Sequence, residues 1–239
     1  MGIFIFVLIF VALIYFRITY ATFKNVKNLA KASLSSSPVT EPPPDENQWA
    51  QNNDFSFVGN FTMKTASMTT SVSAWQHCDR PTFFCKYVVK IKNISQQASD
   101  FVTKFANDIL LTTASTSDAN FFPRYPEAYL QSFSKLSLDE RWYRHVEMEN
   151  YLIDTGGAEL IQMDVSFEKE LFDAAQKQIK YVRTIALWPF RGVYWYFIRK
   201  HLWHNKSIKT QHEKGMIRFP NHLASVRLLR NDNTWPERR

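Results

Sequence analysis

The sequence predicts a mixed α+β protein with one N-terminal transmembrane helix, a small antiparallel sheet followed by helices, and a basic irregular C-terminal tail. Three observations lead to this class. Residues 3–16 are unbroken apolar, residues 55–93 alternate as strands do, and later segments carry apolar residues at helical spacing. With 45% hydrophobic and 15% aromatic residues among 239, the chain is too apolar to be disordered. Two cysteines exclude a disulfide scaffold.

The first element is a membrane anchor over residues 1–23, in which Arg17 is the one charged residue. A helix of this length would span about 30 Å, the thickness of a hydrocarbon core. Arg17 lies near one end, where its long side chain can reach the headgroups. A cleaved signal peptide would carry a basic segment before the apolar run, and a core helix would show a polar face. We therefore expect an uncleaved, single-pass anchor.

The charges that flank the anchor predict its orientation. Arg17, Lys24, Lys27 and Lys31 follow the apolar run, and no Lys or Arg precedes it. The positive-inside rule then places the N-terminus outside and the soluble domain on the cytoplasmic or matrix side. A bacterial inner membrane and a mitochondrial inner membrane fit equally well.

Composition divides the rest of the chain into three parts. Residues 24–51 are a basic juxtamembrane segment followed by a Ser- and Pro-rich linker, which favours extended polyproline II. Residues 52–187 form the soluble α+β domain. Residues 188–239 form a basic aromatic interfacial segment and a tail. From Ser207 onward the weak periodicity predicts no packed core.

The soluble domain begins with strands. Phe55, Phe57 and Phe61 are separated by even steps, and Asp79-Arg80-Pro81 is typical of a turn. Residues 55–93 therefore predict two to four antiparallel strands.

Three helices are expected next, each after residues that can cap its N-terminus. The caps are Ser99-Asp100, the capping box Ser137-Leu-Asp-Glu140, and Ser166, and Pro189 should end or kink the third helix. The first helix would carry Phe101, Phe105, Ile109 and Leu110 on one stripe. In the second, the i,i+4 pairs Glu140–Arg144 and His145–Glu149 predict a solvated helix face.

Positive charge concentrates toward the C-terminus. Residues 176–239 hold fourteen Lys or Arg against three acids, in a chain of formal net charge +7. Within this region, residues 187–206 mix aromatic with basic side chains. The candidate residues for binding a partner or lipid are Trp188, Arg191, Tyr194, Trp195, Tyr196, Arg199, Lys200 and Trp203.

Three kinds of partner suit this composition. Trp and Tyr favour the headgroup region, where basic residues meet anionic lipid. Trp, Tyr and Arg are also the residues that most often anchor protein interfaces. Nucleic acid would use the same residue types, but it is the least favoured partner for a chain anchored in a bilayer. In the plainest interpretation, about half of these aromatic residues belong to the domain's own core.

A short motif suggests catalysis. Asp154-Thr155-Gly156 follows apolar Tyr151-Leu-Ile153 and resembles the signature of aspartic proteases, in which a strand delivers the carboxylate to a tight turn. Two such carboxylates share a proton and activate water. Because no second copy of the motif occurs, the resemblance implies a homodimer. An ordinary turn accounts for the same residues.

Metal-binding patterns are incomplete. His201 and His204 lie three residues apart, but no Asp, Glu or Cys stands at a matching position, and Lys and Arg crowd the segment. Cys78, Cys85 and the neighbouring His77 fall short of a zinc site, and on the reducing side both cysteines should remain thiols. We expect no metal and no cofactor.

Together these patterns predict a non-catalytic accessory subunit or assembly factor of a larger membrane complex. It would dock through its soluble domain and its basic aromatic C-terminus. Its partners would be other subunits of that complex and membrane lipid, with a homodimer as a further option. The alternatives are a membrane-tethered aspartic-type hydrolase that uses Asp154 as a homodimer, and a membrane-tethered nucleic-acid binder.

Overall fold

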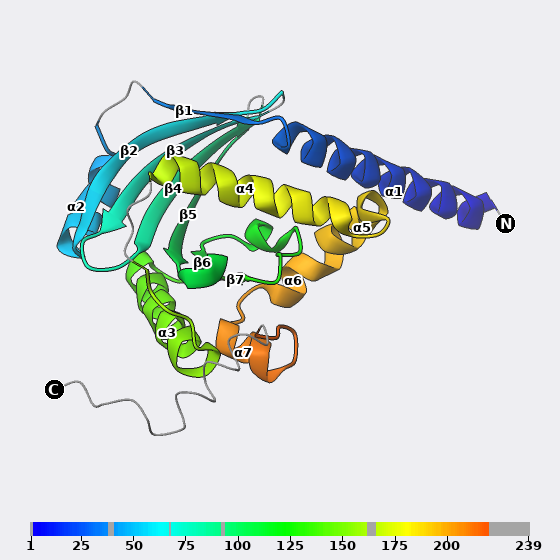
Figure 1. The fold of residues 1–239 in the computed structure, drawn as a ribbon. Helices are drawn as coiled ribbons and strands as arrows, with labels where there is room; N and C mark the ends of the chain where they lie inside the picture. Colours follow the sequence, from blue (N-terminus) through cyan, green and yellow to red (C-terminus); the bar gives the residue numbers. More distant parts are fainter. Residues whose placement is uncertain (1, 38–40, 67, 92–93, 162–165, 220–239) are drawn as a thin grey trace.

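A computed structural model describes residues 2–37, 41–66, 68–91, 94–161 and 166–219. A curved seven-stranded sheet carries helices on both faces, and a long N-terminal helix projects away from it (Figure 1). The predicted α+β class is confirmed.

The strands follow one another in sequence order across the sheet. Neighbouring strands are antiparallel except for the last two, which are parallel. The strands are β1 (Ser33–Ser36), β2 (Phe55–Lys64), β3 (Thr69–His77), β4 (Thr82–Ile91), β5 (Ile94–Lys104), β6 (Leu110–Ala114) and β7 (Ala128–Ser132).

The helices precede β1, lie between β1 and β2, or follow β7 in the chain. They are α1 (Gly2–Leu29), α2 (Pro44–Asn52), α3 (Leu138–Gly156), α4 (Phe167–Thr184), α5 (Trp188–Tyr194), α6 (Lys200–Trp203) and α7 (Ile208–Glu213). A π-helical turn, Trp195–Arg199, joins α5 to α6, and short 3₁₀ turns occupy Ala106–Asp108 and Ser117–Asn120.

The sheet has an apolar layer on each face. Toward α4, Phe61, Val72 and Phe83 pack against Phe167. Toward α2 and α3, the buried cluster comprises Ala50, Phe55, Trp75, Phe84 and Phe101, with Trp49 and Trp142 packed against it. Adjacent residues of a strand point to opposite faces, so the apolar run Phe83–Cys85 supplies both layers.

The strands predicted at residues 55–93 are confirmed as β2, β3 and β4, with Asp79-Arg80-Pro81 in the turn between the last two. A bulge in β2 separates Phe57 from Gly59, whose φ is +153°. The extra residue reverses the alternation. Phe57 therefore packs on Trp75 while Phe61 packs on Phe167, on the opposite face.

The helix predicted after Ser99-Asp100 is wrong, because these residues lie in β5 and the chain continues into β6. Phe101 and Phe105 are four residues apart, a spacing that fits one helix face and also one face of a strand. The intervening Val102 and Thr103 are β-branched, which favours the strand.

The linker is also more ordered than an extended spacer. Residues Ser33–Ser36 pair with β2 as the edge strand β1, and Pro44 lies in the first turn of α2. Proline suits that position because its missing N–H would have no helical partner. The Nε1 of Trp75 donates to Asn47 Oδ1 at 3.0 Å, which holds α2 on the sheet.

Two predicted caps are confirmed. At α3, Ser137 Oγ accepts from Glu140 N at 3.2 Å while the Glu140 carboxylate accepts from Ser137 N at 2.7 Å. At α4, Ser166 Oγ accepts from Lys169 N. Helix α4 ends at Thr184, and Pro189 lies in the first turn of the next helix, α5.

The solvated face expected for α3 is wrong for one of its two pairs. His145 and Glu149 are completely buried against the sheet. Glu140 caps its own helix, and Arg144 pairs with Glu147 at 2.8 Å in solvent.

The tail contributes to the core through α7. Ile208 and Gln211 are completely buried, and Gln211 Nε2 donates to the Leu130 carbonyl at 2.9 Å. The expectation of no packed core after Ser207 is therefore wrong for residues 207–219. A six-residue helix is too short to show a periodic pattern. Residues 220–239 lie outside the described residues.

Candidate membrane-proximal site

The predicted binding segment lies against the second half of α1. The α1 side chains that face it recur at steps of four and three, as one helix face requires. These are Tyr15, Thr19, Thr22 and Val26, of which the last three are buried. The ring of Phe23 stacks on Trp188 at 5.9 Å between centroids, and that of Tyr15 stacks on Phe190 at 6.5 Å. Figure 1 shows α5 beside α1, at the end of α4.

Close approach of the two helices depends on Gly192, which is buried in α5. A Cβ atom at this position would lie 2.1 Å from Thr22 Oγ1 and 2.7 Å from Thr22 Cβ. Small residues such as glycine let two helices pack closely together, a feature typical of helix pairs within membranes.

The outer side of this segment is apolar and exposed. We define the aromatic surface as its exposed large side chains, which are Leu187, Phe190, Tyr194, Tyr196, Phe197, Ile198 and Leu202. Seven further exposed apolar side chains lie on α1: Ile9, Phe10, Val11, Leu13, Phe16, Tyr20 and Phe23. Among the other described side chains, the exposed large apolar residues are Val58, Ile94, Tyr143 and Leu160. Exposed apolar area thus concentrates on α1 and on the neighbouring residues 187–202, as at an interaction site.

Helix α1 is long and apolar enough to cross a membrane over Ile9–Leu29, and it is the one described helix with this property. Little of this stretch is buried against the rest of the protein, unlike a core helix. Lys24 and Lys27 are exposed at its domain end.

The structure divides the eight predicted site residues. Trp195 belongs to the core, where it is 3% exposed and clusters with Val26, Ile179 and Val182. Trp188 packs on the same cluster. Those exposed at the surface are Arg191, Tyr194 and Tyr196, while Arg199, Lys200 and Trp203 are half-buried.

The basic residues of the segment contact their own aromatic neighbours. The Arg199 guanidinium lies 4.1 Å from the ring centroid of Trp203, and Lys200 Nζ lies 4.3 Å from that of Tyr196. Lys200 also pairs with Asp118 at 3.1 Å. Burial lowers the pKa of Arg199 to about 10, so the side chain remains charged at neutral pH.

The histidines of the segment do not converge. His204 lies between two hydroxyls, Ser132 Oγ and Ser134 Oγ, each 2.9 Å from a ring nitrogen, and His201 is exposed. Burial, assisted by the charge of His201, lowers the pKa of His204. Within the described part of the chain, no group of three or more His, Cys, Asp or Glu side chains could hold a metal ion.

Asp154 lacks the surroundings that the protease resemblance requires. Residues 154–156 form the last turn of helix α3, and Gly157 closes that helix in the left-handed conformation with φ +66°. Asp154 is exposed on the helix and does not follow a strand. Cys78 and Cys85 are both free thiols, the first exposed and the second buried.

Sequence reasoning selected this segment but missed five of its exposed side chains: Leu187, Phe190, Phe197, Ile198 and Leu202. The sequence-based selection favoured aromatic and basic residues, most of which carry a polar group at the end of the side chain. It left out purely apolar residues. The signal that could have found them is their number in a segment that also carries Arg and Lys, because a soluble surface seldom keeps that many.

No protein-family model, curated protein or solved structure matches this chain.

Proposed function

We propose that this protein is a single-pass membrane protein that acts as a non-catalytic accessory subunit or assembly factor of a membrane complex. In this proposal α1 spans the bilayer, and the aromatic surface beside it lies at the membrane boundary, where it contacts lipid headgroups and a partner subunit. The observation that carries the proposal is the concentration of exposed apolar side chains on α1 and residues 187–202.

Contacts between residues 187–202 and α1 support this depth for the aromatic surface. Phe190 stacks on Tyr15 and Trp188 stacks on Phe23. Both α1 residues belong to the candidate span Ile9–Leu29, and Phe23 lies beside exposed Lys24 and Lys27, the cations that would meet the headgroups. Tyr and Trp are favoured at that depth because each combines an apolar ring with a polar atom.

Charge supports the orientation in which the domain lies on the cytoplasmic or matrix side. Lys24, Lys27 and Lys31 are exposed at the domain end of α1, and Arg191 is exposed on α5. Four cations on one side of a span match the positive-inside rule and an anionic leaflet.

The docking role is tested by changing the aromatic surface without touching the core. Deletion of residues 187–239 would remove buried Trp195 and Ile208. We therefore choose the combined variant Tyr194→Ser/Phe197→Ser/Ile198→Ser, whose side chains are all exposed. The protein is extracted in mild detergent, separated by native size, and its co-migrating proteins are identified by mass spectrometry. We expect wild type in a defined large assembly and about tenfold less of the variant in it, because apolar and aromatic side chains dominate interface energetics.

The matched control is Tyr143→Ser. Tyr143 is 69% exposed on α3, away from this surface, and its replacement should leave the assembly intact. Unchanged incorporation of the triple variant would contradict the docking role. A wild-type protein that migrates alone would contradict the accessory-subunit proposal itself.

A further inference from the structure

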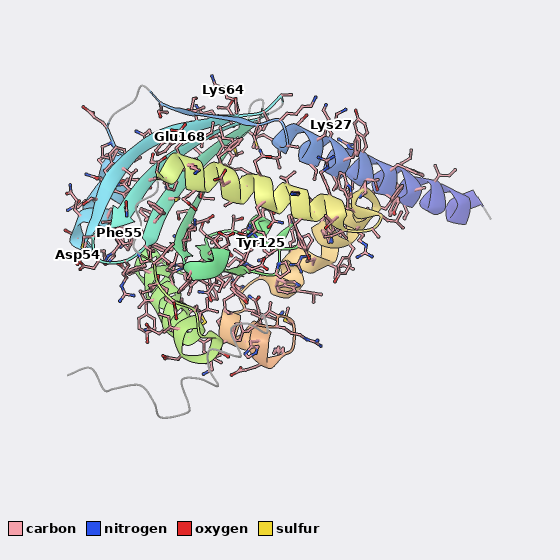
Figure 2. The ribbon with its side chains drawn as sticks, viewed as in Figure 1. Lys27, Asp54, Phe55, Lys64, Tyr125 and Glu168 are labelled. Atoms are coloured by element: carbon pink, nitrogen blue, oxygen red, sulfur yellow. The ribbon has the colours of Figure 1, made fainter. Side chains whose placement is uncertain are left out.

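A cavity of about 280 Å³ lies between α4 and the face of the sheet that α4 covers. Its walls come from β4, β5 and β6 on one side and from α4 on the other. Figure 2 shows Tyr125, one of its lining residues, beside α4, and Glu168 at the start of that helix. The volume lies near the lower end for small-molecule sites, which begin at about 300 Å³.

The register of the sheet explains the cavity walls. Residues opposite one another in adjacent strands share a face, and the pairs Cys85–Asp100 and Phe83–Val102 put these side chains under α4. The next pairs, Val102–Thr112 and Lys104–Leu110, extend the same face. From α4, Leu171 and Ala175 close the space. Most of the lining is therefore apolar.

Among the polar residues of the lining, three have a buried atom with no hydrogen-bond partner. The atoms are Asp100 Oδ1, Arg124 Nε and Gln178 Oε1. The other ends of two of these side chains are held: Arg124 Nη2 donates to the Ala119 carbonyl at 3.1 Å and Gln178 Nε2 to the Pro123 carbonyl at 2.6 Å. Buried polar groups are nearly always paired, so one donor and two acceptors left around one cavity point to a missing partner.

The charges of Asp100 and Arg124 indicate which chemical group the missing partner carries. Asp100 and Arg124 have opposite signs, and each affects the other's pKa through its charge. Burial is the larger influence and raises the pKa of Asp100 to about 6. Since the two charges offset one another, an anionic or cationic ligand would meet one repulsive neighbour, whereas a hydroxyl can donate to the carboxylate and accept from the guanidinium.

The end of α1 closes one side of the cavity. Leu29, the last residue of α1, and Ala32, three residues further on, line the cavity. Lys27 marks this end of the helix in Figure 2. If α1 spans the bilayer as proposed above, the cavity lies next to the membrane surface.

We propose that this cavity binds one small, neutral, single-chain amphiphile from the membrane, with its chain among the apolar walls and its hydroxyl headgroup between Asp100 and Arg124. An apolar cavity of about 150 Å³ accommodates benzene, so 280 Å³ suits a ligand of about ten non-hydrogen atoms. A two-chain phospholipid is too large to be enclosed. The membrane as the source rests on the proposed placement of α1, but the cavity and its polar groups do not.

The probe for this site is decan-1-ol with a photoreactive diazirine in its chain, added to the full-length protein in lipid nanodiscs. After irradiation, peptide mass spectrometry should locate the label on β4, β5 or α4. Unlabelled decan-1-ol should compete for this labelling, whereas decane at the same mole fraction should compete poorly, because it cannot satisfy Asp100 and Arg124.

Two variants fill the cavity from opposite walls: Ala175→Trp from α4 and Val102→Phe from β5. Each should reduce labelling of the cavity about tenfold, because the space for the probe is lost. Ala186→Trp, at an exposed position after α4, is the matched control and should label as wild type does. Circular dichroism confirms that each variant is folded, and the second filling variant serves if the first is not.

Labelling that stays at wild-type level in a folded filling variant would overturn the proposal, as would equal competition by decane. Label confined to α1 and the aromatic surface would place the probe in the bilayer and would also overturn it. The proposed docking function would survive any of these results, because it concerns different residues.

Discussion

Replacing Glu149 with alanine is expected to lower the free energy of unfolding by about 3 kcal/mol, because its carboxylate accepts hydrogen bonds from Arg80, Thr82 and Thr103. The carboxylate is completely buried between α3 and the sheet. Arg80 Nη1 donates to its Oε2 at 2.7 Å, and Thr82 Oγ1 donates to its Oε1 at 2.7 Å. The measurement is equilibrium urea unfolding of the full-length protein in detergent micelles.

The network continues beyond the carboxylate, which is why its loss should be costly. Thr103 Oγ1 hydrogen-bonds both Glu149 and His145 Nε2, and His145 Nδ1 lies 2.8 Å from Thr113 Oγ1. Gln131 Nε2 donates to Thr113 in turn. Without Glu149, the buried hydroxyls of Thr82 and Thr103 lose an acceptor in a place that water does not reach.

Glu147→Ala is the control, because Glu147 lies on the same helix and pairs with Arg144 in solvent. It should change the free energy of unfolding by less than about 0.5 kcal/mol. Equal effects of the two substitutions would show that the buried network does not stabilise the fold.

The pKa of the same carboxylate predicts that the stability of the fold depends on pH. Burial alone would raise the pKa of Glu149, but hydrogen bonds and charge from His145, with hydrogen bonds from Thr103 and Thr82, lower it from 4.5 to about 2. A carboxyl whose pKa is lower in the folded state stabilises that state above its unfolded pKa. This contribution, about 3 kcal/mol for such a shift, should be lost as the pH falls from 4.5 to 2. The difference in stability between wild type and Glu149→Gln should shrink over that window.

Gly192→Ala is expected to separate α5 from α1 and to cost about 2 kcal/mol, as overpacking of a close contact does. The three atoms nearest to the added Cβ all belong to the Thr22 side chain, at 2.1 to 2.8 Å. Thr22→Gly removes those atoms, so Gly192→Ala should cost much less in that background than in wild type. Thermal unfolding in micelles measures the cost of Gly192→Ala in both backgrounds, and near-ultraviolet circular dichroism of the tryptophans reports on their packing.

Gly156→Ala is the matched control for Gly192→Ala. Gly156 is also helical, but an added Cβ would meet its neighbours at 3.7 Å or more, an ordinary contact. Alanine also favours the helix more than glycine does, so this substitution should be neutral or stabilising. If Gly192→Ala behaved in the same way, α5 would not be held against α1 as closely as the structure has it.

Local chemistry predicted the parts of the fold that depend on neighbouring residues. The capping box at Ser137 and the cap at Ser166 form as expected, because a cap needs only the next three residues. Strands β2, β3 and β4 follow from alternation and a turn. The helix predicted after Ser99 was wrong because the apolar spacing of this segment fits a helix and a strand alike. Pairing with β4 favours the strand.

The parts that depend on distant residues could not be predicted in this way. His145 and Glu149 have the spacing of a solvated ion pair, and only Arg80 and the threonines of the sheet make their burial favourable. In the candidate site, composition identified the segment. The division between core Trp195 and exposed Phe197 depends on the π-helical turn and on the position of α1, which no local pattern encodes.

The most direct test of the central proposal, that the aromatic surface lies at the membrane boundary, is the depth of residue 197. A nitroxide is attached to Phe197→Cys, and to Tyr143→Cys as the control, after Cys78→Ser removes the exposed native thiol. Both native side chains are exposed aromatic rings, at 52% and 69%. Power-saturation electron paramagnetic resonance in liposomes then compares collisions with oxygen, which dissolves in lipid, and with a water-soluble nickel chelate. The proposal predicts that the label at 197 meets oxygen and is shielded from nickel, while the label at 143 is open to nickel. Equal nickel accessibility at both positions would contradict it.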